Sequence, residues 1–221
     1  MKTADLFDLS QTLAKPLLEK YVYPWQALGE LCAFIKRLGE SLPKGEYERV
    51  GDDIWAAKDA VIAPSASVTG PAVIGHSAEI RHCAYVRGGV IIGDFAVAGN
   101  STELKNCVLF NRAQAPHYNY IGDSILGFAS HMGAAALTSN LKGDKTNIAI
   151  RFGGETYETG MRKLGAIIGD GAEIGCSAVL NPGTIIGKNT QVYPLCNVRG
   201  VIPPNGILKN SGEFVPKKPR Q

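Results

Sequence analysis

The sequence predicts an all-β fold, a parallel β-helix built from hexapeptide repeats, on three observations. An apolar residue recurs at every sixth position over residues 62–116, a small or apolar residue follows four positions later, and glycines lie beside many repeats. A period of six fits neither a helix nor an alternating strand, but it fits a prism in which each hexad forms one side. The apolar positions are Ile62, Val68, Ile74, Ile80, Val86, Ile92, Ala98, Leu104, Phe110 and Pro116.

The N-terminal region is predicted to be a helical appendage. Leucines recur at helical spacing from Leu6 to Leu17, where Pro16 should kink or shorten the helix, and a second apolar stripe follows Pro24. Two helices with one apolar face each need a surface to cover. We expect them to pack on the first coil of the prism or on a neighbouring subunit.

The repeat has one interruption and one long insertion. Its register breaks near residues 115–120, resumes at Leu126, and returns after the insertion from Ile168 to Val198. A long excursion inside so regular a repeat is more often functional than accidental, although a solvated surface hairpin is the alternative. The predicted organisation is a helical appendage at 1–45, a β-helix at 46–203 with an inserted loop at 141–165, and a tail at 204–221.

Composition excludes several classes of protein. The net charge of +3 gives little electrostatic reason to expect nucleic acid or a membrane as partner. No apolar run approaches the roughly 20 residues that a membrane span requires. The five cysteines are odd in number and show no metal-like C-x-x-C spacing, so we expect reduced thiols and a cytoplasmic protein.

Two cations and a histidine are the candidates for chemistry. Arg87 and Lys105 are 18 residues apart, so they should stack on successive coils, and two unpaired cations there would bind a phosphate. The alternative is that Glu103 or another acid neutralises them. His117 is a candidate general base that lies two sides of the prism further on. We therefore expect a site shared between neighbouring chains of a homotrimer.

Three segments resemble a known family. Residues 105–124, 133–141 and 161–165 look like the acetyltransferase domain of bacterial and archaeal N-acetylglucosamine-1-phosphate uridylyltransferases, and the archaeal sugar-1-phosphate nucleotidylyltransferases match best. The resemblance covers residues 62–200 and implies a left-handed winding of the coils. It also implies direct transfer of acetyl from acetyl-CoA, as co-substrate, to the amine of a hexosamine 1-phosphate, with no metal required.

The resemblance assigns roles to individual positions. His117 matches the general base, and the backbone N–H of Ala134 matches the donor that faces the thioester oxygen. Departures from the pattern are His131, where the family has Asn, and Cys176, where it has Ser or a similar residue near the coenzyme. The remaining matches and expectations are Arg87 and Lys105 for the sugar phosphate, Tyr120 and Asn140 for the sugar, and the tail residues Lys217 and Lys218 for the coenzyme phosphates.

Two alternatives remain open. About 61 residues precede the repeat, too few for a nucleotidylyltransferase domain, so the chain is not itself expected to make nucleotide sugars. The first alternative to the acetyltransferase is a catalytically silent subunit that partners a separate nucleotidylyltransferase, because the substituted positions lie near the site. A zinc carbonic anhydrase is the other alternative, but Gly122 stands where the histidine spacing of that family requires a second ligand.

Overall fold

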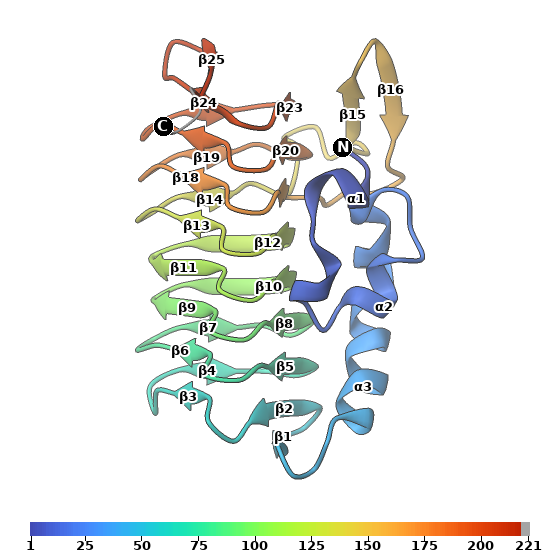
Figure 1. The fold of residues 1–221 in the computed structure, drawn as a ribbon, viewed down its shortest axis with the longest axis vertical. Coiled ribbons are helices and arrows are strands. Elements are labelled where there is room, and N and C mark those ends of the chain that lie inside the picture. The colour runs from blue at the N-terminus through green and yellow to red at the C-terminus, as the bar shows by residue number, and fades with distance from the viewer. Residues whose placement is uncertain (218–221) are drawn as a thin grey trace.

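The computed structural model describes residues 1–217 and confirms a parallel β-helix with an N-terminal helical appendage (Figure 1). Short strands pair in parallel with strands one coil away; Ile74 pairs with Ile92, and Val86 with Leu104. The three sides of the prism are called the first, second and third faces, and each corner is named by the two faces that it joins.

The first face carries strands from nearly every coil, and the second half of β10 and of β12 belongs to it. These strands are β2 (Ile54–Ala57), β5 (Ala72–Ile74), β8 (Val90–Ile92), β10 (Glu103–Leu109), β12 (Tyr120–Leu126), β17 (Ala166–Ile168), β20 (Thr184–Ile186) and β23 (Val201–Ile202). One antiparallel strand, β1 (Tyr47–Gly51), closes the lower end of this face.

The second and third faces complete each coil. The second face holds β3 (Val61–Ile62), β6 (Glu79–Ile80), β9 (Val97–Asn100), β11 (Gln114–His117), β13 (His131–Met132), β18 (Glu173–Ile174), β21 (Gln191–Val192), β24 (Gly206–Leu208) and the antiparallel β25 (Phe214–Pro216). The third face holds β4 (Ser67–Val68), β7 (Tyr85–Val86), the first halves of β10 and β12, β14 (Leu137–Thr138), β19 (Val179–Leu180) and β22 (Asn197–Val198).

The register shift lies earlier in the chain than the sequence predicted. Ile92 pairs with Leu109, and Leu109 with Leu126, so these coils are 17 residues long instead of 18. The inward positions are therefore Leu109 and the residue six further on, Ala115. Phe110 and Pro116 were wrongly assigned to the core of the prism. Phe110 instead packs outside it, with its ring centroid 4.9 Å from that of Phe7.

The shortening occurs where a strand runs straight from the third face into the first. β10 and β12 are seven residues long, whereas most strands here have two to four. With one residue fewer, the chain at the 3–1 corner is too short to form a loop, so it stays hydrogen-bonded to both neighbouring coils. The same corner holds Lys105 and Asp123.

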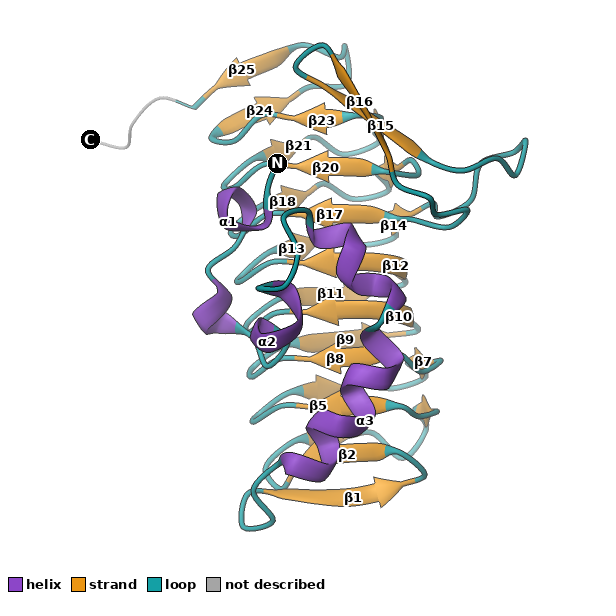
Figure 2. Cartoon of the chain, turned by 90° about the vertical axis from the view of Figure 1, so that its right-hand side faces the viewer, coloured by secondary structure: helices purple, strands orange, loops and turns teal. Residues whose placement is uncertain are grey.

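The N-terminal helices cover the outer surface of the first face. They are α1 (Thr3–Leu6), α2 (Lys15–Leu18), α3 (Leu31–Ser41) and the 3₁₀ helices η1 (Leu9–Gln11) and η2 (Pro24–Gly29). Figure 2 shows α3 crossing the strands of this face, where Val73, Ile91 and Val108 point outward and are buried. Burial of these apolar side chains drives the docking.

The helices pack on the prism of their own chain, but they cover many more coils than the first one, on which packing was predicted. Asp8 donates its backbone N–H to Asp170 Oδ2 at 2.7 Å, and the Asp170 N–H donates to the Leu6 carbonyl at 3.1 Å. The helices thus span the prism from β5 to the coil of Asp170. Only the second and third faces remain uncovered by them.

The insertion forms an antiparallel hairpin of β15 (Ala149–Phe152) and β16 (Glu155–Glu158). Ile148 and Ile150 are 1% and 2% exposed and lie over Gly183, so the base of the hairpin is packed on the prism. Residues 141–165 are called the arm below.

Candidate active site

His117, Ala134 and Cys176 occupy successive coils of the 2–3 corner. Each follows an inward residue of the second face by two positions. The Ala135 N–H donates to the His117 carbonyl at 3.0 Å, and the Ser177 N–H donates to the Ala134 carbonyl at 2.8 Å. The general base and the oxyanion donor expected from the sequence are therefore neighbours within one chain.

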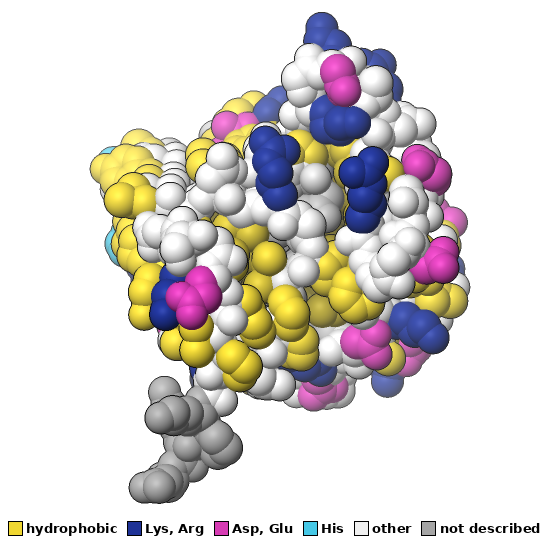
Figure 3. Space-filling model, turned by 90° about the horizontal axis from the view of Figure 1, so that it is seen from above, with side chains coloured by type: hydrophobic (Ala, Val, Ile, Leu, Met, Phe, Trp, Pro, Cys, Tyr) yellow, Lys and Arg dark blue, Asp and Glu magenta, His cyan; other side chains and the backbone are white. Residues whose placement is uncertain are grey.

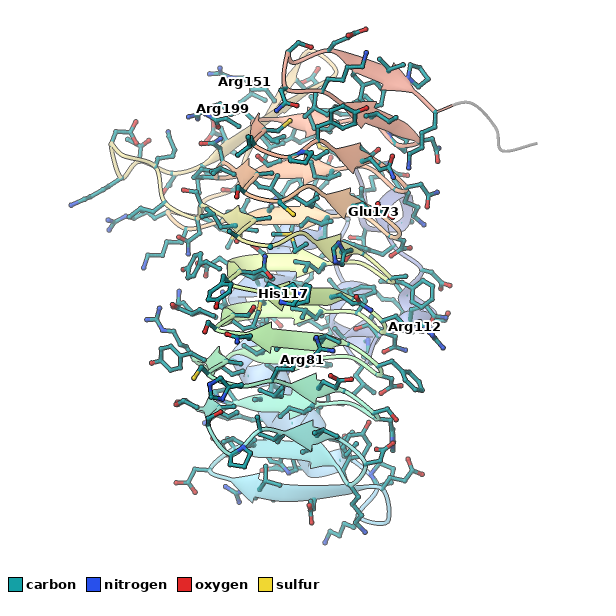
Figure 4. All side chains as sticks on the ribbon, turned by 90° about the vertical axis from the view of Figure 1, so that its left-hand side faces the viewer. Arg81, Arg112, His117, Arg151, Glu173 and Arg199 are labelled. Atoms are coloured by element: carbon teal, nitrogen blue, oxygen red, sulfur yellow. The ribbon has the colours of Figure 1, made fainter. Side chains whose placement is uncertain are left out.

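The turn at His117 is held by a buried amide. Asn119 is 2% exposed; its Nδ2 donates to the Gly133 and Ala136 carbonyls at 2.8 and 2.9 Å, and its Oδ1 accepts from the His117 N–H at 3.1 Å. These bonds clamp the turn to the coil above. The His117 side chain is exposed, near mid-height on the side turned away from the helices (Figure 4).

The backbone N–H of Ala134 has no acceptor within residues 1–217. At the 1–2 corner two of the corresponding N–H groups are capped by carboxylates, since Asp94 accepts from His76 and Asp170 accepts from Phe128, both at 2.8 Å. No such carboxylate caps the 2–3 corner at Ala134. This N–H is therefore free to donate to a ligand.

His131 and Cys176 line one groove of about 320 Å³ on the second face. His131 is flanked on neighbouring coils by Gln114 and Glu173. Cys176 is exposed at the edge of the groove, next to the coil of Ala134. The structure thus places these two predicted binding residues in one groove, on the coil of Ala134 and on the coil next to it.

The predicted sugar-phosphate residues lie at a different corner. Arg87 and Lys105 follow the paired residues Val86 and Leu104, so they lie on successive coils of the 3–1 corner, as expected. They are not unpaired, and that premise was wrong. Arg87 Nη1 lies 2.7 Å from Glu103 Oε1, which raises the pKa of Arg87 through this bond, and Lys105 Nζ lies 3.5 Å from Asp123 Oδ1.

Asp123 is a site residue that sequence reasoning missed. Its side chain is 5% exposed and accepts from Asn106 Nδ2 at 2.8 Å and from Asn140 Nδ2 at 2.5 Å. Asn140 also reaches Tyr120 Oη at 3.1 Å, and burial raises the pKa of Tyr120. The five-residue step from Ile121 to the next inward leucine marks the shortened corner, but only the fold shows that Asp123 is buried there.

The predicted coenzyme residues are not brought together. Lys217 Nζ donates to the Asn189 carbonyl at 2.6 Å and lines a groove with Gly171 and Asn205, at the far edge of the second face from Cys176. Lys218 lies outside the described residues.

Within the described part of the chain, no group of three His, Cys, Asp or Glu side chains is placed to hold a metal ion. Among the same residues, no helix is long and apolar enough to cross a membrane.

A parallel β-helix of six-residue sides, with a histidine and a free N–H on adjacent coils of one corner, defines the class as a hexapeptide-repeat protein. No protein-family model matches the chain. The chain is related to the bifunctional GlmU proteins of methanogens, as the sequence predicted. It is 33% identical over 137 residues to the one from Methanococcus maripaludis strain C5, covering 62% of this chain and 33% of that protein.

Other relatives agree with this relationship. GlmU of Methanococcus maripaludis strain S2 is 29% identical over 90% of this chain and 48% of its own length. The Escherichia coli K12 protein described as a putative uncharacterized acetyltransferase, YaiX, is 34% identical over 61% of this chain and 66% of its own length. The chain spans about a third to a half of the GlmU proteins that it matches.

Solved structures resemble the chain more distantly. WeeI from Acinetobacter baumannii is 18% identical, with a TM-score of 0.43 over 71% of this chain and 57% of that one. A mutant of perosamine N-acetyltransferase from Caulobacter crescentus, in complex with CoA and GDP-perosamine, is 18% identical, with a TM-score of 0.35 over 73% and 55%.

Proposed function

We propose that the chain is an acetyl-CoA-dependent N-acetyltransferase acting on an amino-sugar 1-phosphate such as glucosamine 1-phosphate. One observation carries the proposal: the exposed His117 lies one coil from the unpartnered Ala134 N–H, in a chain related to bifunctional GlmU proteins. The other named relative, an acetyltransferase by description, points to the same chemistry.

The residues at the 2–3 corner supply what direct acyl transfer needs. The sugar amine attacks the thioester carbonyl carbon, a C–N bond forms, the C–S bond breaks, and coenzyme A leaves as a thiolate that takes up a proton. His117 accepts the proton that the amine loses, and the Ala134 N–H donates to the carbonyl oxygen as negative charge develops there. A base of this kind contributes on the order of 10²–10⁴ in rate.

The acceptor site is proposed to be completed by a neighbouring chain of a homotrimer. In one chain His117 ends the second face and Lys105 ends the third, so a full face separates them. The N-terminal helices cover the first face, whereas Tyr118 and Leu195 at the 2–3 corner are 65% and 73% exposed. Burial of this corner against the 3–1 corner of another chain would bring His117 to Lys105.

The charges at the 3–1 corner decide how the acceptor panel is designed. Glu103 and Asp123 balance Arg87 and Lys105, so a phosphate would have to compete with two carboxylates. The panel therefore contains glucosamine, glucosamine 1-phosphate and galactosamine 1-phosphate. Thiol release from acetyl-CoA, measured with each acceptor, tests the proposal. No release with any of them would favour the silent subunit that partners a separate nucleotidylyltransferase.

Two variants test the roles of the corners. His117→Ala should lower turnover by about 10²-fold or more while the oligomer, measured by light scattering, stays intact. Lys105→Ala should be impaired on its own, but trimers refolded from a mixture of the two variants should regain activity, because some sites combine intact residues from both chains. Activity retained in His117→Ala would contradict the role of the base, and failure of the mixture to recover would contradict the shared site.

The proposal places the protein in the cytoplasm, the reduced compartment that suits five free cysteines.

A further inference from the structure

Four cations at the upper part of the 3–1 corner lack carboxylate partners. Lower on the prism, Arg87 and Lys105 are paired with acids, and at the 1–2 corner of the upper coils Lys188 is paired with Asp170. The four upper cations make no ion pair with any residue in the range 1–217, and all are exposed: Arg151, Arg162, Lys163 and Arg199.

The arm carries three of these residues, of which Arg162 and Lys163 are adjacent in the sequence, and the fold brings Arg199 to the corner at which the arm ends. Arg199 follows the inward residue Val198, as Lys105 follows Leu104, so it lies at the 3–1 corner. Lys163 forms an isolated bridge with Leu141, and the next N–H, of Leu164, donates to the Asn140 carbonyl at that corner. Thr138 pairs with Leu180 and Leu180 with Val198, so Arg199 lies two coils, or about 10 Å, above the base of the arm.

Arg151 approaches the same place from the hairpin. It belongs to β15, which contacts β23, and Arg199 lies two residues before β23. Figure 4 shows Arg151 and Arg199 at one upper edge of the molecule. Seen from above, several Lys and Arg side chains gather on this part of the surface (Figure 3).

The arm holds its cations in place. Ile148 and Ile150 are buried against the prism, the Ile148 N–H donates to the Met161 carbonyl at 2.8 Å, and the Thr159 side chain caps the Ile148 carbonyl. Because the backbone that carries these cations is anchored, like charges are held on one part of the surface, and an anion that bridges them relieves their repulsion.

We propose that Arg151, Arg162, Lys163 and Arg199 form a binding site for the phosphate groups of a nucleotide-bearing ligand. The guanidinium of arginine can donate bidentate hydrogen bonds to phosphate oxygens, and three of the four residues are arginines. Coenzyme A is one source of these phosphates, and a sugar nucleotide is the other. Where the ligand is coenzyme A, the inference rests on the proposed acetyl transfer and assigns its phosphates to the arm instead of to Lys217.

Calorimetric titration of the full chain tests the site without turnover. The titrants are coenzyme A, 3′-dephospho-coenzyme A and uridine diphosphate, each at low and moderate salt. The double variant R151Q/R199Q should bind its ligand with an affinity at least about tenfold lower than that of the wild type, because two charge-assisted contacts are lost. Its affinity should also depend less on the salt concentration. The matched control is R112Q, an exposed arginine of the 1–2 corner that lies 5.0 Å from the Phe95 ring centroid, and it should match the wild type.

The titrants distinguish the two sources. If R151Q/R199Q loses affinity for coenzyme A but not for the dephospho form, the 3′-phosphate lies at the arginines. If it loses affinity for both, the pyrophosphate lies there. A loss confined to uridine diphosphate assigns the site to a sugar nucleotide. Equal affinity of R151Q/R199Q and wild type for all three titrants, or no binding by the wild type, overturns the inference. A wild type that binds through these arginines but transfers no acetyl refutes only the proposed function.

Discussion

Removing the Asp123 carboxylate tests whether the 3–1 corner is organised around it. In Asp123→Ala, the amide donors of Asn106 and Asn140 lose acceptors at 2.8 and 2.5 Å, while the Lys105 contact at 3.5 Å is weak. An unsatisfied donor costs about 1–3 kcal/mol when buried, and both amides are partly exposed, so we expect a loss of about 3 kcal/mol. Urea denaturation followed by circular dichroism measures the change in the free energy of unfolding.

The matched control is Asp144→Ala. Asp144 also accepts bonds from its neighbours, including the Thr146 N–H at 3.0 Å, but its side chain is 59% exposed in the arm. Its loss should change stability by less than about 0.5 kcal/mol. If Asp123→Ala were as stable as Asp144→Ala, the buried carboxylate would not organise the corner, and the reasoning from its hydrogen bonds would be refuted.

Three further predictions concern stability. Gly99→Ala would place a Cβ 1.8 Å from the Pro116 carbonyl oxygen and should lower the free energy of unfolding in urea by about 3 kcal/mol. Gly143→Ala, with open space around the new Cβ, should cost almost nothing. Equal midpoints of urea unfolding for the two variants would contradict the close packing of β9 and β11. Desolvation lowers the pKa of His76, but its bond to Asp59 at 2.9 Å, the charges of Asp59 and Asp94 and the contact with Glu46 together outweigh this and raise the pKa. The stabilising contribution of His76 is therefore full below pH about 6.5 and is lost as pH rises. His76→Gln should lose more stability at pH 5.5 than at pH 8.5, and a pH-independent loss would be the contrary result. Ile148→Ala removes a side chain that is 1% exposed and should free the arm for tryptic cleavage at Lys145 or Arg151. Phe152→Ala, at a position that is 43% exposed, should not. Equal cleavage of the two variants would show that the arm is not anchored through Ile148.

The hexad pattern predicted the prism because burial of one aliphatic residue per side is a local, periodic requirement. It misplaced the shift in register for a physical reason. Phe110 and Pro116 are apolar and stand at the sixth position, so the pattern continued through them, although Leu109 and Ala115 are the residues inside. Because Leu109 and Phe110 are both apolar, either residue could be the inward one, and only pairing with the neighbouring coils decides which it is.

The candidate site shows a similar division. The positions of His117 and Ala134 on adjacent coils follow from the coil length, which the sequence gives approximately. The partner of Lys105 does not follow, because an acid in a sequence is normally solvated, and only the fold shows Asp123 buried on the next coil. The apolar stripes of the helices likewise predict a buried face without specifying which coils it covers.

The shortened coils link the register to the chemistry. Where β10 and β12 cross the 3–1 corner, Asn106 and Asp123 have positive φ of 47° and 49°, and Asn106 donates to Asp123 at 2.8 Å. The Asp123 carboxylate, one coil above Lys105, balances its charge. Above that level the arm and Arg199 carry cations without such partners in the described chain. A ligand with several phosphates would therefore bind most strongly at the upper coils. The lower part of the 3–1 corner is nearly neutral and would instead bind the hydroxyl groups and the amine of a sugar.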